Sequence, residues 1–185
     1  IARNISTSVS KATLIEDVKN EFSSDISRPT LDDYLNALEK LFILEYIPAT
    51  NLNLRSKTPL RVSPKLEFVD PSIVTAVMGL NREDLVNDLN FTEFIFENLC
   101  MRDLKIYADS IRASISYYRD KNDLEVDAIL KTENGKWGAI EIKLGDGEIE
   151  EAANTLLEFK EKIDTEKFGN PLFLMVVTGT TYSYR

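Results

Sequence analysis

The chain has 185 residues, 43% of them hydrophobic and 29% charged, with a formal net charge of −9. This composition fits a globular protein of one domain or two small ones, and no apolar run is long enough to span a membrane. The single cysteine, Cys100, excludes an internal disulfide and predicts a reducing, cytoplasmic setting. The sequence has no histidine, which excludes Ser-His and Cys-His nucleophile pairs and favours magnesium or manganese, held by carboxylates, for any metal site.

The negative charge is concentrated in the second part of the chain. Residues 1–79 carry a net charge of −1, and residues 80–185 carry −8. Proteins that bind nucleic acid unaided usually present a basic face, so this balance argues against tight, independent DNA binding. The chain begins at Ile1 rather than methionine, and we expect it to be a piece of a longer protein.

The first part of the chain predicts two helices followed by extended segments. Ser10 is placed to cap a helix over about Lys11–Phe22, and Ser27 with Pro29 marks the start of a second helix. This order resembles a helix-turn-helix of the winged type. The exposed side of the second helix carries the acids Asp32, Asp33 and Glu39, which would repel phosphate. We therefore expect this module to pack against protein more than to read DNA.

The segment Ile43–Phe68 is the candidate wing. It has no acid between Glu45 and Glu67 but carries four basic residues, namely Arg55, Lys57, Arg61 and Lys65. One interpretation is a wing that contacts DNA phosphates. The other is a solvated loop between two strands, which is favoured because small basic loops are common.

Gly79 is placed to end a short helix, so we expect a domain boundary near Gly79–Asn81. This divides the chain into a winged-helix-like domain over residues 1–79 and a second domain over residues 80–185. In the second domain, an apolar helix is predicted from about Phe91 to Tyr107, with Glu97 among its apolar residues. A carboxylate near a buried surface needs a partner, which is either a structural ion pair or a metal site.

The second domain is predicted to be an α/β unit with three strands, a helix and a fourth strand. Asn134–Gly135 provides the turn between the two central strands. The last strand is apolar enough to be buried on both faces, and it should pair beside the strand of Glu141 through a right-handed crossover. The expected ranges are Ile111–Arg119, Leu124–Leu130, Lys136–Leu144, Glu148–Ile163 for the helix, and Pro171–Thr178.

Three charged residues of the central strands, Asp127, Glu141 and Lys143, would project from one side of the sheet if the two strands pair through this turn. Two carboxylates can bind a divalent ion that lowers the pKa of bound water, and a lysine can orient that water or stabilise transition-state charge. Glu97 could add a ligand from the preceding helix. Taken alone, however, Glu-x-Lys on a strand more often marks a surface ion pair.

The order of Glu97, Asp127 and Glu141-Ile142-Lys143 resembles that of the PD-(D/E)xK, or restriction-endonuclease-like, superfamily. From about residue 5 onward, the sequence also resembles the C-terminal region of prokaryotic AAA-type ATPases, more closely than the superfamily as a whole, in stretches such as Phe68–Ser72, Tyr117–Asp120 and Leu124–Asp127. The resemblance implies a mixed sheet flanked by helices, a preceding winged helix and an upstream ATPase domain as partner. It also implies Mg²⁺ or Mn²⁺ at Asp127 and Glu141, with Lys143 and Glu97 as catalytic residues.

Two features depart from the pattern of these relatives. No Walker-type loop is present, so nucleotide hydrolysis cannot be assigned to this chain. Glu93 stands four residues before Glu97, where we expect glycine in relatives. The sequence leaves three hypotheses: a metal-dependent nuclease acting on DNA, a catalytically silent nuclease fold that binds or regulates the ATPase, and DNA docking through the basic wing without chemistry.

Overall fold

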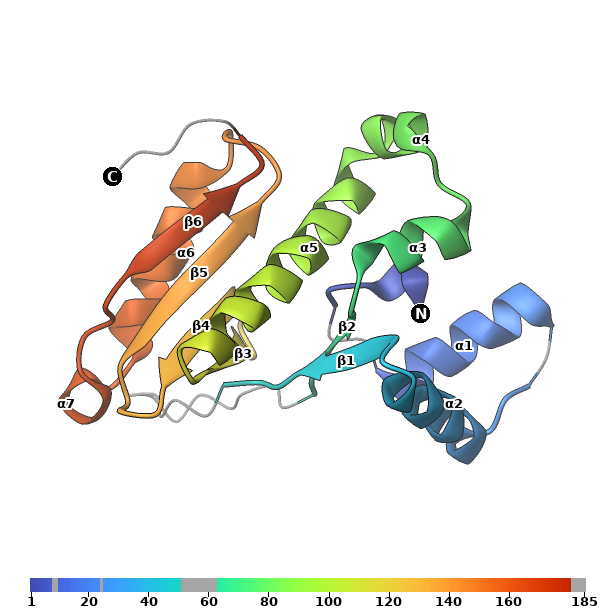
Figure 1. The fold of residues 1–185 in the computed structure, drawn as a ribbon, viewed down its shortest axis with the longest axis horizontal. Helices are drawn as coiled ribbons and strands as arrows, with labels where there is room; N and C mark the ends of the chain where they lie inside the picture. Colours follow the sequence, from blue (N-terminus) through green and yellow to red (C-terminus); the bar gives the residue numbers. More distant parts are fainter. Residues whose placement is uncertain (8–9, 24, 51–62, 181–185) are drawn as a thin grey trace.

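The computed structural model describes residues 1–7, 10–23, 25–50 and 63–180. Figure 1 shows a mixed sheet with a long helix, α5, on one side and α6 on the other, and a smaller group of helices and two strands beside α5. This is the α/β class that the sequence predicts. In the described part of the chain, no helix combines the length and hydrophobicity needed to cross a lipid bilayer.

The smaller group begins with η1 (Ala2–Asn4), α1 (Lys11–Phe22) and α2 (Arg28–Lys40). Ser10 and Ser27 cap α1 and α2, because each hydroxyl accepts a hydrogen bond from the backbone N–H three residues later. The chain then forms β1 (Leu44–Ile47) and β2 (Lys65–Phe68), which pair antiparallel. The two predicted helices and their caps are confirmed, and the three wing residues Arg55, Lys57 and Arg61 lie outside the described residues.

A short helix, α3 (Pro71–Met78), ends at Gly79 in the left-handed conformation, as the sequence predicts. After α4 (Arg82–Asn87), the chain enters α5 (Leu89–Ser110). The apolar core of the smaller group includes Leu31, Leu44 and Val74, and Phe91 and Ile95 of α5 pack against it. Residues at the start of α5 therefore pack with the smaller group, although this helix also covers the larger sheet. The apolar contacts of the smaller group thus extend beyond the boundary that the sequence predicts near residue 80.

The larger sheet has the order β3–β4–β5–β6, formed by Ala113–Arg119, Glu125–Thr132, Trp137–Lys143 and Leu174–Thr178. The first two pairings are antiparallel, and β5 pairs parallel with β6 across α6 (Ile149–Lys162) and the short α7 (Thr165–Phe168). Separate apolar clusters lie on its two faces: Phe159 of α6 packs against Trp137 and Tyr118, and Met101 of α5 packs with Ile140. The predicted hairpin and the pairing of the last strand beside the strand of Glu141 are both confirmed.

Strand β6 differs from the prediction of a strand buried on both faces. It lies at the edge of the sheet, its residues are only partly buried, and Met175 is 40% exposed. Its apolar sequence fits the α6 side, where Leu174 and Val176 pack against the core. Val177 packs on the α5 side, so the strand has apolar contacts on both faces although it lies at the edge of the sheet. Hydropathy alone does not distinguish such an edge strand from a central strand.

A bulge in β4 shapes the sheet beside its polar residues. Ser116 pairs with Ile129 but Tyr118 pairs with Val126, so two residues of β4, Asp127 and Ala128, oppose the single residue between Ser116 and Tyr118. Such bulges re-aim side chains out of the regular alternation. Val126 consequently packs with Ile129 on the α6 side, while Ala128 packs on the α5 side.

Substitution of Phe159 by alanine tests the packing between α6 and the sheet. Phe159 is fully buried, and its ring centroid lies 4.7 Å from that of Tyr118 and 6.0 Å from that of Trp137. We expect F159A to lower the free energy of unfolding by about 3–5 kcal/mol in urea denaturation followed by circular dichroism. Leu157, on the same helix but 53% exposed, is the matched control, and L157A should cost under about 1 kcal/mol. Equal losses in the two variants would contradict this packing.

Candidate functional site

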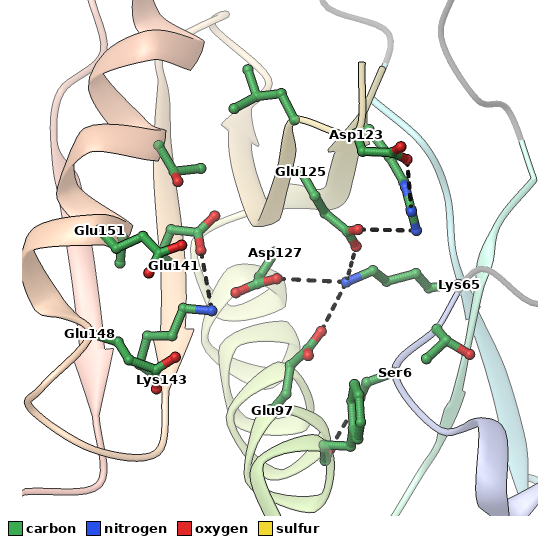
Figure 2. Close-up of a pocket in the computed structure, with 16 residues that line it drawn as sticks. Ser6, Lys65, Glu97, Asp123, Glu125, Asp127, Glu141, Lys143, Glu148 and Glu151 are labelled. Atoms are coloured by element: carbon green, nitrogen blue, oxygen red, sulfur yellow. Dashed lines mark hydrogen bonds and ion pairs between the residues drawn. The ribbon is translucent and has the colours of Figure 1, made fainter. Parts of the chain in front are cut away.

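One pocket of about 500 Å³ is lined by Lys65, Glu97, Asp127, Glu141 and Lys143, all of which the sequence singles out (Figure 2). Seven carboxylates and three cationic side chains line it, contributed by β2, α5, the β3–β4 region, β5 and α6. The acids are Glu97, Asp123, Glu125, Asp127, Glu141, Glu148 and Glu151, and the cations are Lys65, Arg119 and Lys143. Because acids outnumber cations, the pocket attracts cations and protons more than free phosphate.

Asp127 and Glu141 line the same pocket from the paired strands β4 and β5. The bulge sets the position of Asp127, and its Oδ2 accepts a hydrogen bond from the backbone N–H of Ile142 at 2.9 Å. The side chains of both acids are nearly buried, with 12% of Asp127 and 6% of Glu141 exposed. The structure thus brings together the two carboxylates that the sequence pairs.

Glu141 has a carboxylate oxygen without a protein partner. Its Oε1 is buried and makes no hydrogen bond, while its Oε2 lies 4.0 Å from Nζ of Lys143. Burial, with the nearby charge of Asp127, raises the pKa of Glu141 to about 9. The carboxylate therefore favours a proton, or a bound cation in place of one.

Lys143 is the third predicted residue of the strand site, and its Nζ also lies 3.9 Å from Glu93 of α5. Partial burial works against its charge, but the carboxylates of Asp127, Glu141 and Glu93 prevail and raise the pKa of Lys143. The side chain is consequently a permanent cation near neutral pH. Glu93 stands one helical turn before Glu97, on the same face of α5, so the i to i+4 spacing could have placed it near the site.

Lys65 lies in a different place from the one expected for a wing residue. Its side chain is 2% exposed, and its ammonium lies 2.9 Å from Glu97 Oε1 and 2.7 Å from Glu125 Oε1. Asp127 Oδ1 is 3.7 Å from the same nitrogen. The basic cluster of the sequence placed Lys65 with surface residues, whereas its strand carries it into the acid pocket, as Figure 2 shows.

Glu97 projects from α5 toward this group, as predicted, and its structural partner is Lys65. Burial raises the pKa of Glu97 to about 8, with Lys65 opposing the shift and Asp127 adding to it. The sequence allows two interpretations of Glu97, a structural ion pair and a place in a metal site. The structure agrees with each, because Glu97 is paired with Lys65 and also lines the pocket with Asp127 and Glu141. Among the described residues, no three acidic or cysteine side chains are already arranged as ligands around one point.

A second buried polar group lies behind Lys65 on the same strand. Glu67 is fully buried, and its Oε2 accepts hydrogen bonds from Ser6 Oγ at 3.0 Å and Asn98 Nδ2 at 2.8 Å. Burial raises the pKa of Glu67 to about 7, although Lys65 and these donors oppose the shift. Lys65 and Glu67 of β2 thus meet the neighbouring residues Glu97 and Asn98 of α5, which fixes β2 against the helix.

Comparison with known proteins divides the chain in two. A family model described as a domain of unknown function (DUF4143) matches residues 92–185, half of the chain. The chain belongs to this family. A second model, also a domain of unknown function (DUF8612), matches residues 1–84. No curated protein and no solved structure gives a match.

The pocket draws on both matched regions. The DUF4143 region supplies Glu97, Asp127, Glu141 and Lys143, and the DUF8612 region supplies Lys65. A site inferred from the DUF4143 region alone would lack the cation that lies closest to Glu125.

The buried carboxyl of Glu67 predicts a pH dependence of stability. Its pKa is raised on folding, so its contribution is fully present below about pH 4.5 and is lost as the pH rises through about 7. We expect the free energy of unfolding of the wild type to fall by roughly 2–3 kcal/mol relative to E67Q between pH 5 and 8. E16Q, which changes an exposed acid of α1, should keep the wild-type profile. Parallel profiles for wild type and E67Q in urea denaturation would contradict the assignment.

Proposed function

We propose that the DUF4143 region is a metal-dependent phosphodiesterase of the nuclease type that acts on DNA. Asp127 and Glu141 would hold Mg²⁺ or Mn²⁺, Lys143 would be the catalytic lysine, and Glu97 would assist. The observation that carries the proposal is Glu141 Oε1, a buried oxygen without a hydrogen-bond partner, in a pocket also lined by Asp127 and Lys143. A buried polar atom of this kind calls for an ion, a proton or water.

The residues present fit a hard divalent cation. Both proposed ligands are carboxylates, and magnesium is commonly bound through one or two carboxylates together with waters and substrate phosphate. The excess of acids over cations in the pocket favours an added positive charge. When bound, the ion would lower the pKa of a coordinated water and offset charge on the phosphate.

The protein side chains divide the remaining work. Lys143 stays protonated, so it can donate hydrogen bonds to a phosphate oxygen or to the attacking water, but it cannot take up a proton as a general base. The Ile142 N–H fixes one oxygen of Asp127 and so orients this carboxylate. Glu97 is paired with Lys65, whose ammonium also lies near Asp127. Glu97 therefore acts through Lys65, as a positioning residue in the described arrangement.

The resemblance to the C-terminal region of prokaryotic AAA-type ATPases supports two further parts of the proposal. Residues 1–79 would form a winged-helix-like module, in keeping with two capped helices followed by an antiparallel strand pair. An upstream ATPase domain would be the protein partner, and a cytoplasmic location would follow. DNA contact through Arg55, Lys57 and Arg61 stays a prediction from the sequence.

One observation favours the second candidate, a silent nuclease fold that binds or regulates its partner. Glu97 and Glu125, together with the nearby Asp127, already face a protein cation in Lys65, and the described residues offer no ready set of three ligands. A scaffold retained for protein interaction needs only this internal neutralisation. The two candidates differ in whether the folded chain cleaves DNA.

Cleavage of supercoiled plasmid tests the nuclease proposal. We expect nicking with Mn²⁺ or Mg²⁺ and a loss of at least about 100-fold in rate for D127A and K143A. D127A removes a metal ligand, and K143A removes the cation that stabilises charge on the phosphate. E161Q, at an exposed position of α6, is the control and should keep the wild-type rate. If the folded wild type cleaves neither duplex nor single-stranded nucleic acid with either metal, the silent-module candidate replaces the nuclease.

The raised pKa of Glu141 predicts that metal binding strengthens with pH. The carboxyl must lose its proton to bind a cation, so affinity for Mn²⁺ should rise up to about tenfold per pH unit between pH 6 and 9. Calorimetric titration in buffers of different ionisation enthalpy should also detect proton release. E141Q should bind weakly at every pH and lose this dependence, whereas a pH-independent affinity in the wild type would exclude Glu141 as a ligand.

A further inference from the structure

Lys65 lies where the acids of the pocket would otherwise require a bound cation. It begins β2, in the part of the chain outside the DUF4143 match, and its ammonium reaches Glu97 of α5 and Glu125 of β4. Lys65 is almost completely buried, and its nitrogen lies 5.5 Å from the centre of the Tyr117 ring. An ammonium group has three donors, so a carboxylate-lined position of this kind can accommodate it.

The contact of Lys65 with Asp127 is the weakest of the three. Its distance of 3.7 Å is beyond a hydrogen bond, so Asp127 Oδ1 is attracted to Lys65 without being bonded to it. Arg119 also lies 3.3 Å from Oε2 of Glu125, which makes Glu125 the better satisfied acid. Among the three oxygens that face Lys65, the one held least tightly is therefore Oδ1 of Asp127, and the unpartnered oxygen of Glu141 belongs to the same pocket.

We propose that Lys65 is a tethered cation that competes with a divalent metal ion for the Asp127 side of the site. The inference rests on the proposed function, since it takes Asp127 and Glu141 as the metal ligands. Two positive charges a few ångströms apart in a buried pocket repel strongly. A metal ion consequently binds with low affinity while Lys65 is in place, and it binds tightly once the ammonium is withdrawn or its charge removed.

The position of Lys65 gives this competition a structural consequence. Because β2 belongs to the sheet of the smaller group, the same side chain joins that group to the acids of the larger sheet. A metal ion that displaces Lys65 also breaks this contact between the smaller group and the larger sheet. The DUF8612 region would in this way control the affinity of a site located mainly in the DUF4143 region.

The test is Mn²⁺ binding to the complete chain, measured by titration calorimetry at pH 8. We expect K65M to bind Mn²⁺ at least tenfold more tightly than the wild type, and K65R, which keeps the charge, to stay within about threefold of it. K105M is the matched control, because Lys105 pairs with Glu45 outside the pocket. An affinity of K65M equal to or weaker than that of the wild type would overturn the proposal.

K65M leaves buried carboxylates without a partner, so the double variant K65M/E125Q reduces the unpaired charge and should show the same gain in affinity. A measurement on the wild type complements both variants. Saturating Mn²⁺ should increase acylation of Lys65 by an amine-specific reagent, detected by mass spectrometry, relative to that of Lys162 on α6. Unchanged acylation of Lys65 at saturation would contradict displacement.

The outcomes separate this inference from the proposed activity. A gain in Mn²⁺ affinity in K65M without nicking by any variant supports the competition and rejects the nuclease. Metal-dependent nicking by the wild type, with no affinity gain in K65M, supports the nuclease and rejects the competition.

Discussion

The structure depends on neutralising a concentration of carboxylates that the fold itself creates. α5, β4, β5 and α6 each bring acids to one pocket, and several of these acids are nearly buried. Unpaired buried charges are too costly to persist, so cations or protons must accompany them. Lys65, Lys143 and the raised pKa values of Glu97 and Glu141 are all answers to this constraint. The pocket is therefore organised around positive charge, whether or not it performs chemistry.

The packing explains why the smaller group cannot be considered apart from the pocket. Its apolar core reaches Phe91 and Ile95 of α5, while Lys65 and Glu67 of β2 contact the polar side of the same helix. Apolar burial and polar pairing thus hold β2 against α5 together. A movement of β2 would expose apolar surface and also leave Glu97 without its ammonium partner. This coupling makes the charge state of the pocket and the docking of the smaller group parts of one equilibrium.

Local patterns predicted most of the elements, because their signals are local. Ser10, Ser27 and Gly79 act through hydrogen bonds or backbone conformation within one turn, and the Asn134–Gly135 turn sets the central hairpin. That hairpin is the basis for predicting Asp127 and Glu141 at one site, and the two residues line one pocket. The role of Lys65 could not be predicted in this way, since it depends on how β2 meets α5 and β4. The edge position of β6 is likewise decided by tertiary packing, and the bulge at Asp127 has no signature in its alternating sequence.

The same surplus of acids bears on the choice between a nuclease and a silent scaffold. A nuclease must keep its carboxylates available, so it cannot satisfy all of them internally without losing affinity for metal. A scaffold has no such requirement, and complete internal pairing would stabilise it. The described pocket lies between these two cases. Glu97 and Glu125 are paired with Lys65. Glu141 keeps one oxygen without a partner, and one oxygen of Asp127 lies 3.7 Å from Lys65, beyond a hydrogen bond. Incomplete pairing at the two strand acids costs stability at positions where a simple scaffold gains nothing from it. This incomplete pairing is the reason for which we propose a site that binds a cation, and a proton on Glu141 meets the same need when no cation is bound.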